Sequence, residues 1–395
     1  MRYSADRFHH SQCYKCCFDK RKTGELNMYD DCVYKIKDSV DLFLSNDTYI
    51  LAYYMNTRQK KSFRVNTEAV YLLENIDGVK NVGEIKEFMY QNYGVETNTI
   101  DNVLAIMEKN RIITVKNVCT DILSVNEKNR YSRQINYFAE FLNSEEDGIK
   151  AQKKIIDSKV LIFGVGAVGG DVAFELAMAG VKHITLYDFD SVEKSDVARH
   201  MGYRDDYVGK NKAEALANEL KKINNEIIVN IVCEGMKPET NVEHLIEGYD
   251  FVVNTLDEPY IGYTSAKISR ICVKYKIPHY IAGGFDAHLA STGELVIPYV
   301  TPCVECYADY FKESLKNWKP KKHPVTIRYT EIGGLSCMSL FSASYACIEI
   351  IKCLAGLVRM EDNYKIRGEF LFNNMSLTYL SVKRNRNCPI CGVHS

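Results

Sequence analysis

The chain has 395 residues, more than one hydrophobic core usually holds, so two domains are expected. Its composition, with 46% hydrophobic and 26% charged residues, is that of a globular protein. The formal net charge of -1 offers no electrostatic attraction to nucleic acid or to an anionic membrane surface. Neither class of partner is therefore expected.

Two stretches of the chain predict a cytoplasmic location. Residues 1–20 are polar and lack the apolar core of a signal peptide. The most apolar stretch near the C-terminus, residues 342–358, is interrupted by Glu349 and Lys352, which indicates a buried helix rather than a membrane span. In a reducing compartment the fourteen cysteines are expected to be thiols or metal ligands.

The first 120 residues have the pattern of a small α+β domain. Two runs of β-type residues enclose three segments with helical spacing of apolar residues. In chain order these are a strand at 49–55, helices at 67–76, 82–93 and 97–109, and a strand at 111–115. This order is typical of a winged helix, and we predict such a domain over residues 1–120.

Residues 121–395 are predicted to form a second domain of the α/β class. After a charged helical segment at 129–154, strands and helices alternate. This favours a Rossmann-type, mostly parallel sheet with helices on both faces. The expected strands are 159–163, 184–188, 227–233, 251–255 and 278–282, and the expected helices are 173–179, 210–223, 265–275 and 339–357.

A glycine-rich loop connects the first of these strands to a helix. Gly164, Gly166 and Gly169 follow the G-x-G-x-x-G order, which lets the backbone approach phosphates at a helix N-terminus. Asp188, at the end of the next strand, is placed to hold ribose hydroxyls. The pattern predicts a nucleotide site, and a glycine-rich turn without a ligand is the alternative.

Charged residues near the later strand ends favour ATP over a nicotinamide cofactor. Arg199, Lys212 and Asp257 are expected at the ligand-binding edge of the sheet. Cations and Mg²⁺ neutralise the charge that builds on phosphoryl oxygens and departing pyrophosphate, a need that hydride transfer lacks. Asp257 is a suitable oxygen ligand for Mg²⁺. The cofactors expected at this edge are ATP and Mg²⁺.

These residues together resemble the ThiF/MoeB/ubiquitin-activating-enzyme superfamily of adenylating enzymes, over residues 130–391. The matching elements are the R-Y-S-R-Q run from Arg130 to Gln134, the glycine loop, the nucleotide-binding acids Asp188 and Asp190, the S-x-x-x-R ending at Arg199, the G-x-x-K ending at Lys212, and Asp257.

The resemblance implies a role for each matching residue. Asp188 would hold the ribose, while Arg199 and Lys212 would contact the ATP phosphates. Asp257 would bind Mg²⁺. Arg133 would act across the interface of a homodimer, as an arginine finger in the partner's site.

The chain departs from the family pattern beside these residues. Asp196 and Glu258 stand where asparagine is common, and both add negative charge near the phosphates. Asp196 either binds a second metal or faces away. His200 replaces a common glutamine, and it either bonds to nucleotide or peptide or has a packing role.

Two C-x-x-C pairs lie far apart in the sequence, Cys303 with Cys306 and Cys388 with Cys391. Four thiolates in this arrangement can close a tetrahedral Zn²⁺ site with a structural role. The family resemblance independently implies the same zinc. A redox pair is the alternative.

The other cysteines bear on whether a thioester forms. Cys337, near the start of the helix expected at 339–357, is the candidate nucleophile. It is nevertheless expected to be a small core residue, as are Cys347 and Cys353. This favours an enzyme that stops at, or directly uses, the acyl-adenylate. A looser cluster of either metal ligands or free thiols comprises Cys13, Cys16, Cys17 and Cys32.

Residues 46–118 resemble the PqqD-like precursor-recognition element of enzymes that modify ribosomally made peptides. Such elements hold a leader peptide as an added strand on a sheet edge. The alternatives are a winged helix that only packs against the catalytic domain and one that binds DNA. Acidic residues on its helices, among them Glu68 and Glu84, disfavour DNA.

The predicted function is ATP-dependent adenylation of a carboxylate on a precursor peptide, with release of pyrophosphate, in the maturation of a peptide natural product. The product either keeps AMP or is cyclised. The main alternative is a MoeB-type activator of a sulfur-carrier or ubiquitin-like protein, against which the N-terminal extension argues. An NAD-dependent oxidoreductase and an inactive scaffold subunit are further alternatives, which Arg199, Lys212 and Asp257 disfavour.

Overall fold

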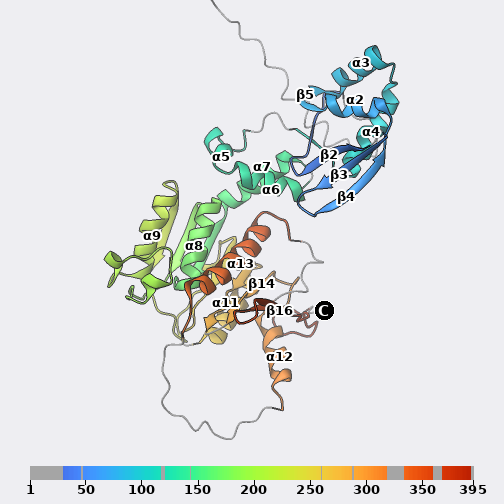
Figure 1. Cartoon of the computed structure of the whole chain (residues 1–395). Helices are drawn as coiled ribbons and strands as arrows, with labels where there is room; N and C mark the ends of the chain where they lie inside the picture. The colour runs from blue at the N-terminus through green and yellow to red at the C-terminus, as the bar shows by residue number, and fades with distance from the viewer. Residues whose placement is uncertain are drawn as a thin grey trace, which may run out of the picture. The chain divides into compact units, whose positions relative to one another are not determined.

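The computed structural model describes residues 30–45, 48–116, 121–142, 144–258, 260–286, 289–317, 333–358 and 367–392. By its internal contacts the chain divides into two compact units, Met1–Lys150 and Ala151–Ser395 (Figure 1). The first unit includes helices α5 (Val125–Arg130) and α6 (Ser132–Phe141) and the first part of α7 (Glu145–Asp157). The domain boundary expected near residue 120 stays a prediction.

Three helices of the first unit lie where the sequence predicts them. Helix α3 starts at a capping box, in which Asn81 and Glu84 each accept a hydrogen bond from the other's backbone N–H. It ends at Gly94, whose φ of 67° is in the left-handed region that favours glycine. The helices are α2 (Thr67–Asn75), α3 (Val82–Tyr93) and α4 (Thr97–Lys109).

Two three-stranded antiparallel sheets complete the first unit. One has the order β2-β3-β4 and the other β5-β1-β6. Only β3 and β6 were expected from the sequence, because the other strands are short or polar; β4 in particular is almost fully exposed. The strands are β1 (Val33–Ile36), β2 (Val40–Ser45), β3 (Tyr49–Tyr54), β4 (Gln59–Arg64), β5 (Asp77–Asn81) and β6 (Ile113–Val115).

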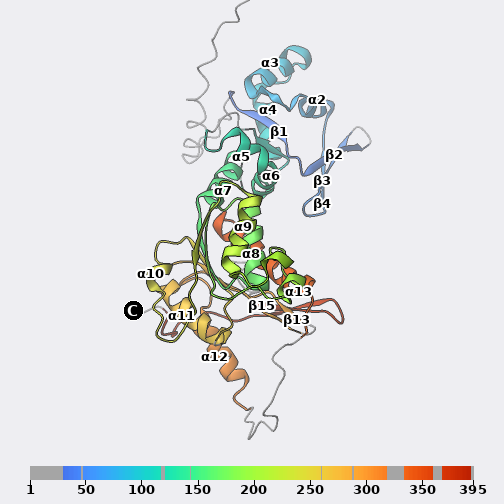
Figure 2. The same ribbon diagram turned by 90° about the vertical axis from the view of Figure 1, so that its left-hand side faces the viewer.

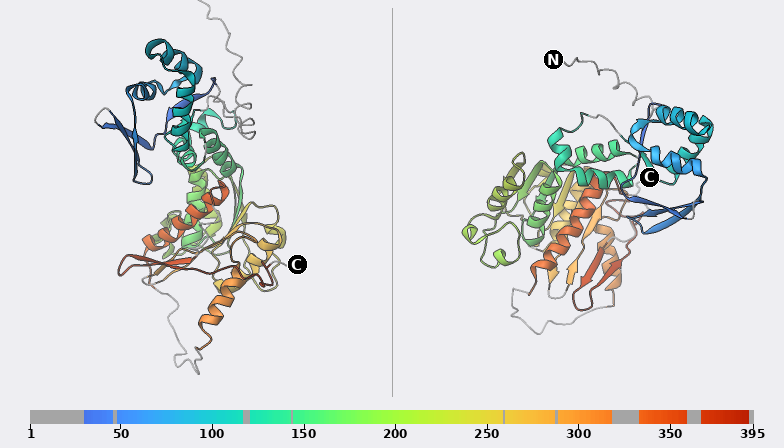
Figure 3. Two further views of the ribbon diagram at one scale, coloured as in Figure 1. Left: turned by 90° about the vertical axis from the view of Figure 1, so that its right-hand side faces the viewer. Right: turned by 45° about the horizontal axis from the view of Figure 1, so that its top comes forward.

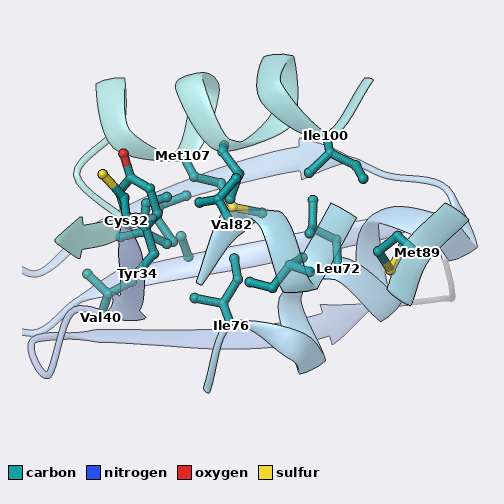
Figure 4. Close-up of a cluster of buried hydrophobic side chains, with 14 of the residues drawn as sticks. Cys32, Tyr34, Val40, Leu72, Ile76, Val82, Met89, Ile100 and Met107 are labelled. Carbon is teal, nitrogen blue, oxygen red and sulfur yellow. The ribbon is translucent and has the colours of Figure 1, made fainter. Parts of the chain in front are cut away.

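The core of the first unit draws side chains from both sheets and all three of these helices. Figure 4 shows Tyr34 and Val40 from the strands in one buried cluster with Leu72, Met89 and Ile100 from the helices. Each of these five side chains is at most 5% exposed. Residues 30–116 of this unit therefore carry a hydrophobic core of their own.

The second unit is built on a six-stranded sheet with the order β14-β11-β10-β7-β8-β9. Five strands are parallel, and the edge strand β14 is antiparallel to β11. The strand order reverses between β7 and β10, the point at which open α/β sheets bind ligands. The strands are β7 (Lys159–Phe163), β8 (His183–Tyr187), β9 (Ile228–Val232), β10 (Phe251–Asn254), β11 (His279–Ile281) and β14 (Glu294–Val296).

Helices cover both faces of this sheet, which confirms the predicted Rossmann-type fold. Figure 2 shows α8 and α9 on one side of the strands and α10 and α11 on the other. Side chains of α10 and α11 form one buried cluster with Leu161, Phe163 and Val252 of the sheet. The helices are α8 (Ala167–Ala179), α9 (Lys212–Ile223), α10 (Glu243–Ile246) and α11 (Ile261–Lys274).

Helix α13 (Ser336–Leu354) runs beside α8 (Figure 1). Among the described residues it is the one helix long and apolar enough to cross a membrane by length and composition, a property that core helices of globular proteins share. A four-stranded antiparallel sheet packs near it and appears in orange to red in Figure 3. That sheet contains β12 (Phe285–Asp286), β13 (Leu289–Ser291), β15 (Arg367–Leu371) and β16 (Ser376–Leu380).

Candidate functional site

The glycine loop forms a tight turn between β7 and α8. Gly164 has a φ of +82°, and a Cβ there would lie 2.6 Å from Thr255 Oγ1. A Cβ on Gly169 would lie 2.1 Å from the Gly164 carbonyl oxygen. Nothing lies within 4 Å of the corresponding position at Gly166, the residue that caps α8. The loop thus leaves open space at a helix N-terminus, where a phosphate can accept backbone hydrogen bonds.

Asp188 fastens this loop to the end of β8. One carboxylate oxygen accepts the Val165 N–H at 2.8 Å and the other accepts the Asp190 N–H at 2.9 Å. Burial raises the pKa of Asp188, and the two N–H groups oppose that rise. Each oxygen retains a second lone pair, so the side chain keeps the capacity to accept from ribose hydroxyls.

Asp196 lies between the two cations expected at the phosphates. It is 1% exposed and sits in the short 3₁₀ helix η1 (Asp196–Ala198). Oδ1 lies 2.9 Å from Arg199 Nη2, and Oδ2 lies 3.6 Å from Lys212 Nζ while accepting the Glu193 N–H at 2.9 Å. Asp196 therefore does not face away. It holds Arg199 and Lys212 in one cluster.

The environment keeps Asp196 ionised. Burial alone would raise its pKa, but the interactions with His200, the Glu193 N–H and Lys212 outweigh burial and lower the pKa. His200 is buried, with Nε2 3.4 Å from Asp196 Oδ1, and burial lowers the pKa of its imidazole. The cluster therefore contains two carboxylates, Asp190 and Asp196, which hold the two cations Arg199 and Lys212 beside a neutral imidazole.

Lys212 is also joined to the acid after β8. Its Nζ lies 3.5 Å from Asp190 Oδ2, and its backbone N–H donates to the Asp190 carbonyl at 2.8 Å. Asn211 caps α9 by accepting the Glu214 N–H. The start of α9 therefore presents Lys212 at the carboxyl end of β8.

Asp257 follows β10 and is exposed, as is Glu258. Strand β10 pairs with β7, with Asn254 opposite Phe163, so this segment starts beside the glycine loop. Thr255 Oγ1 contacts the carbonyl oxygens of Phe163 and Gly164, at 3.1 and 2.9 Å. Because the Asp257 carboxylate is exposed to solvent, a hard cation can reach it.

The four predicted metal-ligating cysteines come together in the fold. The Sγ atoms of Cys303 and Cys388 are 3.6 Å apart, those of Cys306 and Cys391 are 3.5 Å apart, and all four lie within 4.8 Å of one another. These separations exceed a disulfide bond and approach the roughly 3.8 Å between ligands of a tetrahedral Zn–S₄ site. The buried thiols fit a zinc ion.

A model of the ThiF family matches residues 131–391. The chain belongs to the ThiF family. Among curated relatives, the vegetative HesA protein of Trichormus variabilis is 30% identical over 281 residues, covering 69% of this chain and 92% of that protein. Adenylyltransferase and sulfurtransferase MOCS3 of Caenorhabditis briggsae is 27% identical, covering 68% of this chain and 62% of that protein.

Solved structures resemble more of the chain than the ThiF match covers. E. coli MccB in complex with AMPCPP and MccA has a TM-score of 0.67 at 21% identity, covering 91% of this chain and 99% of that one. PaaA has a TM-score of 0.67 at 22% identity, covering 88% of this chain and all of that one. At these identities the likeness concerns the fold. Together with the family match, it confirms the predicted superfamily and enzyme class, an ATP-dependent adenylyltransferase.

Two further candidate residues of this ThiF-family chain are exposed on their helices. Arg133 is exposed on α6, in the first unit. Cys337 is exposed in the first turn of α13, so the expectation of a core residue is wrong for it. Cys347 is buried and Cys353 half-buried, because they lie further along the helix beside α8. Cys32 is buried in the core of the first unit; the other members of its cluster, Cys13, Cys16 and Cys17, lie outside the described residues.

Two residues that support the site carry no sequence signal. Tyr203 donates from its hydroxyl to the Val165 carbonyl at 2.8 Å and lies 3.3 Å from the Lys212 carbonyl, which joins the glycine loop to α9. Thr255, which follows β10, donates from its hydroxyl to the Gly164 carbonyl and so joins the loop to that strand end. No motif marks either position, because each acts through contacts between segments distant in sequence.

Proposed function

We propose that this ThiF-family enzyme adenylates a carboxylate on a ribosomally made precursor peptide. The observation that carries the proposal is the likeness to MccB and PaaA over about nine tenths of the chain, which extends beyond residues 131–391 into the first unit. One of the MccB structures contains AMPCPP and MccA. The shared fold of the first unit supports a peptide rather than a small acid as the substrate.

The chemistry follows from the charge distribution at the nucleotide site. A carboxylate oxygen of the peptide attacks the α-phosphorus of ATP, a new acyl–phosphate bond forms, and the bond to the departing pyrophosphate breaks. Arg199 and Lys212 would stabilise the charge on the phosphoryl oxygens and on pyrophosphate. Asp188 would hold the ribose and Asp257 would hold Mg²⁺, which neutralises phosphate charge when bound.

The first unit offers an edge for the peptide. Among the residues that the structure describes, strand β4 pairs with β3 alone, so its outer edge can accept an extended chain. Its exposed side chains include Lys60, Lys61 and Arg64, with Arg58 in the preceding turn. This basic edge favours a peptide segment that carries acidic residues.

The structural zinc and the homodimer are further parts of the proposal. Zinc held by the four cysteines would fasten residues 388–391 to the start of α12 (Val304–Ser314). Exposed apolar side chains on the second unit support a self-association surface, among them Ile348 of α13 at 57% and Met375 of the β15–β16 turn at 71% exposure. Arg133 would act in the site of the partner subunit.

A second candidate function is favoured by the sequence relatives. By their names, MOCS3 is an adenylyltransferase and sulfurtransferase, and the enzyme E1 of Haloferax volcanii, 26% identical, activates SAMP. Under this alternative the substrate is the C-terminus of a small carrier protein.

Exchange of labelled pyrophosphate into ATP distinguishes the candidates. The purified full chain is assayed alone, with short acidic peptides encoded beside its gene, and with carrier proteins ending in Gly-Gly. Exchange that depends on one peptide supports the proposal, and the mass of that peptide then separates gain of AMP from loss of water. Exchange only with a carrier protein overturns the peptide proposal in favour of the second candidate.

A further inference from the structure

Helix α6, which carries Arg133, is packed into the first unit. Ile135 and Phe138 on its inner face are 4% and 2% exposed. Gly148 of α7 lies so close that a Cβ there would be 2.5 Å from the Ile135 carbonyl oxygen. The sequence pattern groups Arg133 with the adenylation domain, yet its helix belongs by contacts to the unit that contains the β2-β3-β4 sheet.

A polar cluster at the C-terminal end of α6 joins it to that sheet. The Ser39 hydroxyl donates to Glu140 Oε2 at 2.5 Å, and Lys37 Nζ lies 3.8 Å from the same oxygen. Asn56 Nδ2 reaches it at 3.5 Å. Lys37 and Ser39 lie in the turn between β1 and β2, and Asn56 lies in the turn between β3 and β4. One carboxylate of α6 thus contacts the two turns that lie at the same end of this sheet.

The Lys37–Glu140 pair is partly withdrawn from water. The Lys37 side chain is 7% exposed and the Glu140 side chain 20%. Burial lowers the pKa of Lys37, and the charge of Glu140 opposes that effect. A buried charge that loses its partner is strongly unfavourable, so the pair holds the helix in one position.

A small cavity of about 20 Å³ adjoins the pair, enough for one water molecule. Its lining is mostly polar or charged and comprises Lys35, Lys37, Asp38, Thr114, Asn136, Ala139, Glu140 and Glu145. Lys35 lies 3.3 Å from Asp38 and 3.9 Å from Glu145, which extends the ionic contacts to α7. Side chains from β1, the following turn, α6 and α7 therefore form one network, which we call the joint.

Arg133 and Glu140 share one side of α6. They are seven residues apart, which is close to two full turns and about 10 Å along the axis. A helix of this length behaves as a rigid rod between them. The position of Glu140 on the sheet turns consequently sets the direction in which Arg133 leaves the helix.

We propose that Lys37 and Glu140 are positioning residues for Arg133, coupling the peptide-recognition sheet to the catalytic cation. The inference rests on the proposed function, in which Arg133 acts on the nucleotide of the partner subunit. A peptide bound along β4 and Arg133 on α6 are then both attached to the first unit. Peptide docking and the placement of Arg133 are linked through the joint rather than through the nucleotide-binding unit.

The test is a double-mutant cycle on peptide-dependent pyrophosphate exchange with the full chain. Glu140→Gln keeps an acceptor for Ser39 but removes the ion pair, and it is made alone and together with Arg133→Ala. We expect Glu140→Gln to lower kcat roughly tenfold with KM for ATP and Kd for the peptide unchanged. In the Arg133→Ala background it should cost less than about twofold, because both changes remove the same effect.

Lys37→Met removes the other member of the pair and is expected to show the same non-additivity. Glu87→Gln, which neutralises an exposed carboxylate of α3 in the same unit, is the matched control and should leave kcat unchanged. An unchanged kcat for both joint variants, or an equal loss with and without Arg133, overturns the positioning role while leaving peptide adenylation intact. Absence of peptide-dependent exchange in the unmodified enzyme instead overturns the proposed function, and this inference with it.

Discussion

Asp196 organises the charged part of the nucleotide site from a buried position. Because its carboxylate contacts both Arg199 and Lys212, the two cations are gathered before a nucleotide arrives. Preorganised charge stabilises a transition state more than charge that must first be collected. The sequence showed only that an acid stands where asparagine is common. Its role depends on contacts among residues 193, 199, 200 and 212, which only the folded chain brings together.

The cation cluster predicts a large loss of activity when one charge is removed. Lys212→Ala is expected to lower kcat/KM for ATP in pyrophosphate exchange by about 10²–10³-fold, the effect of removing one preorganised stabilising group. Lys210→Ala is the control, since that ammonium lies 5.0 Å from the Tyr207 ring, outside the cluster. Equal activity of the two variants, with unchanged circular dichroism, would refute the assignment of Lys212.

Asp171 of α8 gives the enzyme a predicted pH dependence of stability. It is 1% exposed, one oxygen accepts the Met201 N–H at 3.0 Å, and the other has no hydrogen-bond partner among the described residues. Burial raises its pKa to about 7, against the opposing effect of the Met201 N–H. Above about pH 4 the unfolded chain releases a proton that the folded chain keeps. The free energy of unfolding therefore falls as pH rises from about 4 to 7.

Asp171→Asn removes this titration while keeping an acceptor for Met201. Urea denaturation should show the variant more stable than the parent by about 2–4 kcal/mol at pH 8 and equally stable near pH 4. The stability difference between the variant and the parent should grow as the pH rises from about 4 to 8. A difference that is independent of pH would show that Asp171 ionises freely in the folded protein.

At the scale of elements, the cluster of four cysteines leads to a prediction about metal content. Cys388→Ser should lose the single zinc expected per chain and lower Tm by roughly 5–10 °C, because the bound metal contributes to folding. Cys233→Ser changes an exposed cysteine outside the cluster and should retain both metal and Tm. Inductively coupled plasma mass spectrometry and differential scanning fluorimetry measure the two quantities. Full zinc content in Cys388→Ser would contradict the proposed ligand set.

Elements with strong local signals could be predicted from the sequence, and those defined by long-range pairing could not. Helix α3 begins at the capping residue Asn81 and ends before Gly94, and both signals are visible in the sequence. Strand β7 is a continuous apolar run. Strand β4 has no apolar alternation, because side chains on both of its faces are exposed and pairing with β3 determines its conformation. Strands β13 and β15 pair across more than 70 residues, which no local pattern specifies.

For the whole molecule, the proposed action of Arg133 across a dimer predicts complementation. Arg133→Ala and Lys212→Ala should each retain only a small residual activity alone. After co-expression about half of the dimers are mixed, and each mixed dimer has one site with both cations, so about a quarter of the parental activity should return. No recovery from dimers verified as mixed by mass spectrometry would place Arg133 and Lys212 of one subunit in the same site.

The basic side chains of β4 also affect whether molecules of the free enzyme aggregate with one another. A strand edge with unpaired backbone groups can join the same edge of another molecule and seed aggregation. Lys60, Lys61 and Arg64 would oppose one another if two β4 edges met, so like charges discourage that pairing. An acidic peptide meets no such repulsion. The same side chains would thus keep the edge open to the proposed peptide substrate and closed to other copies of the chain.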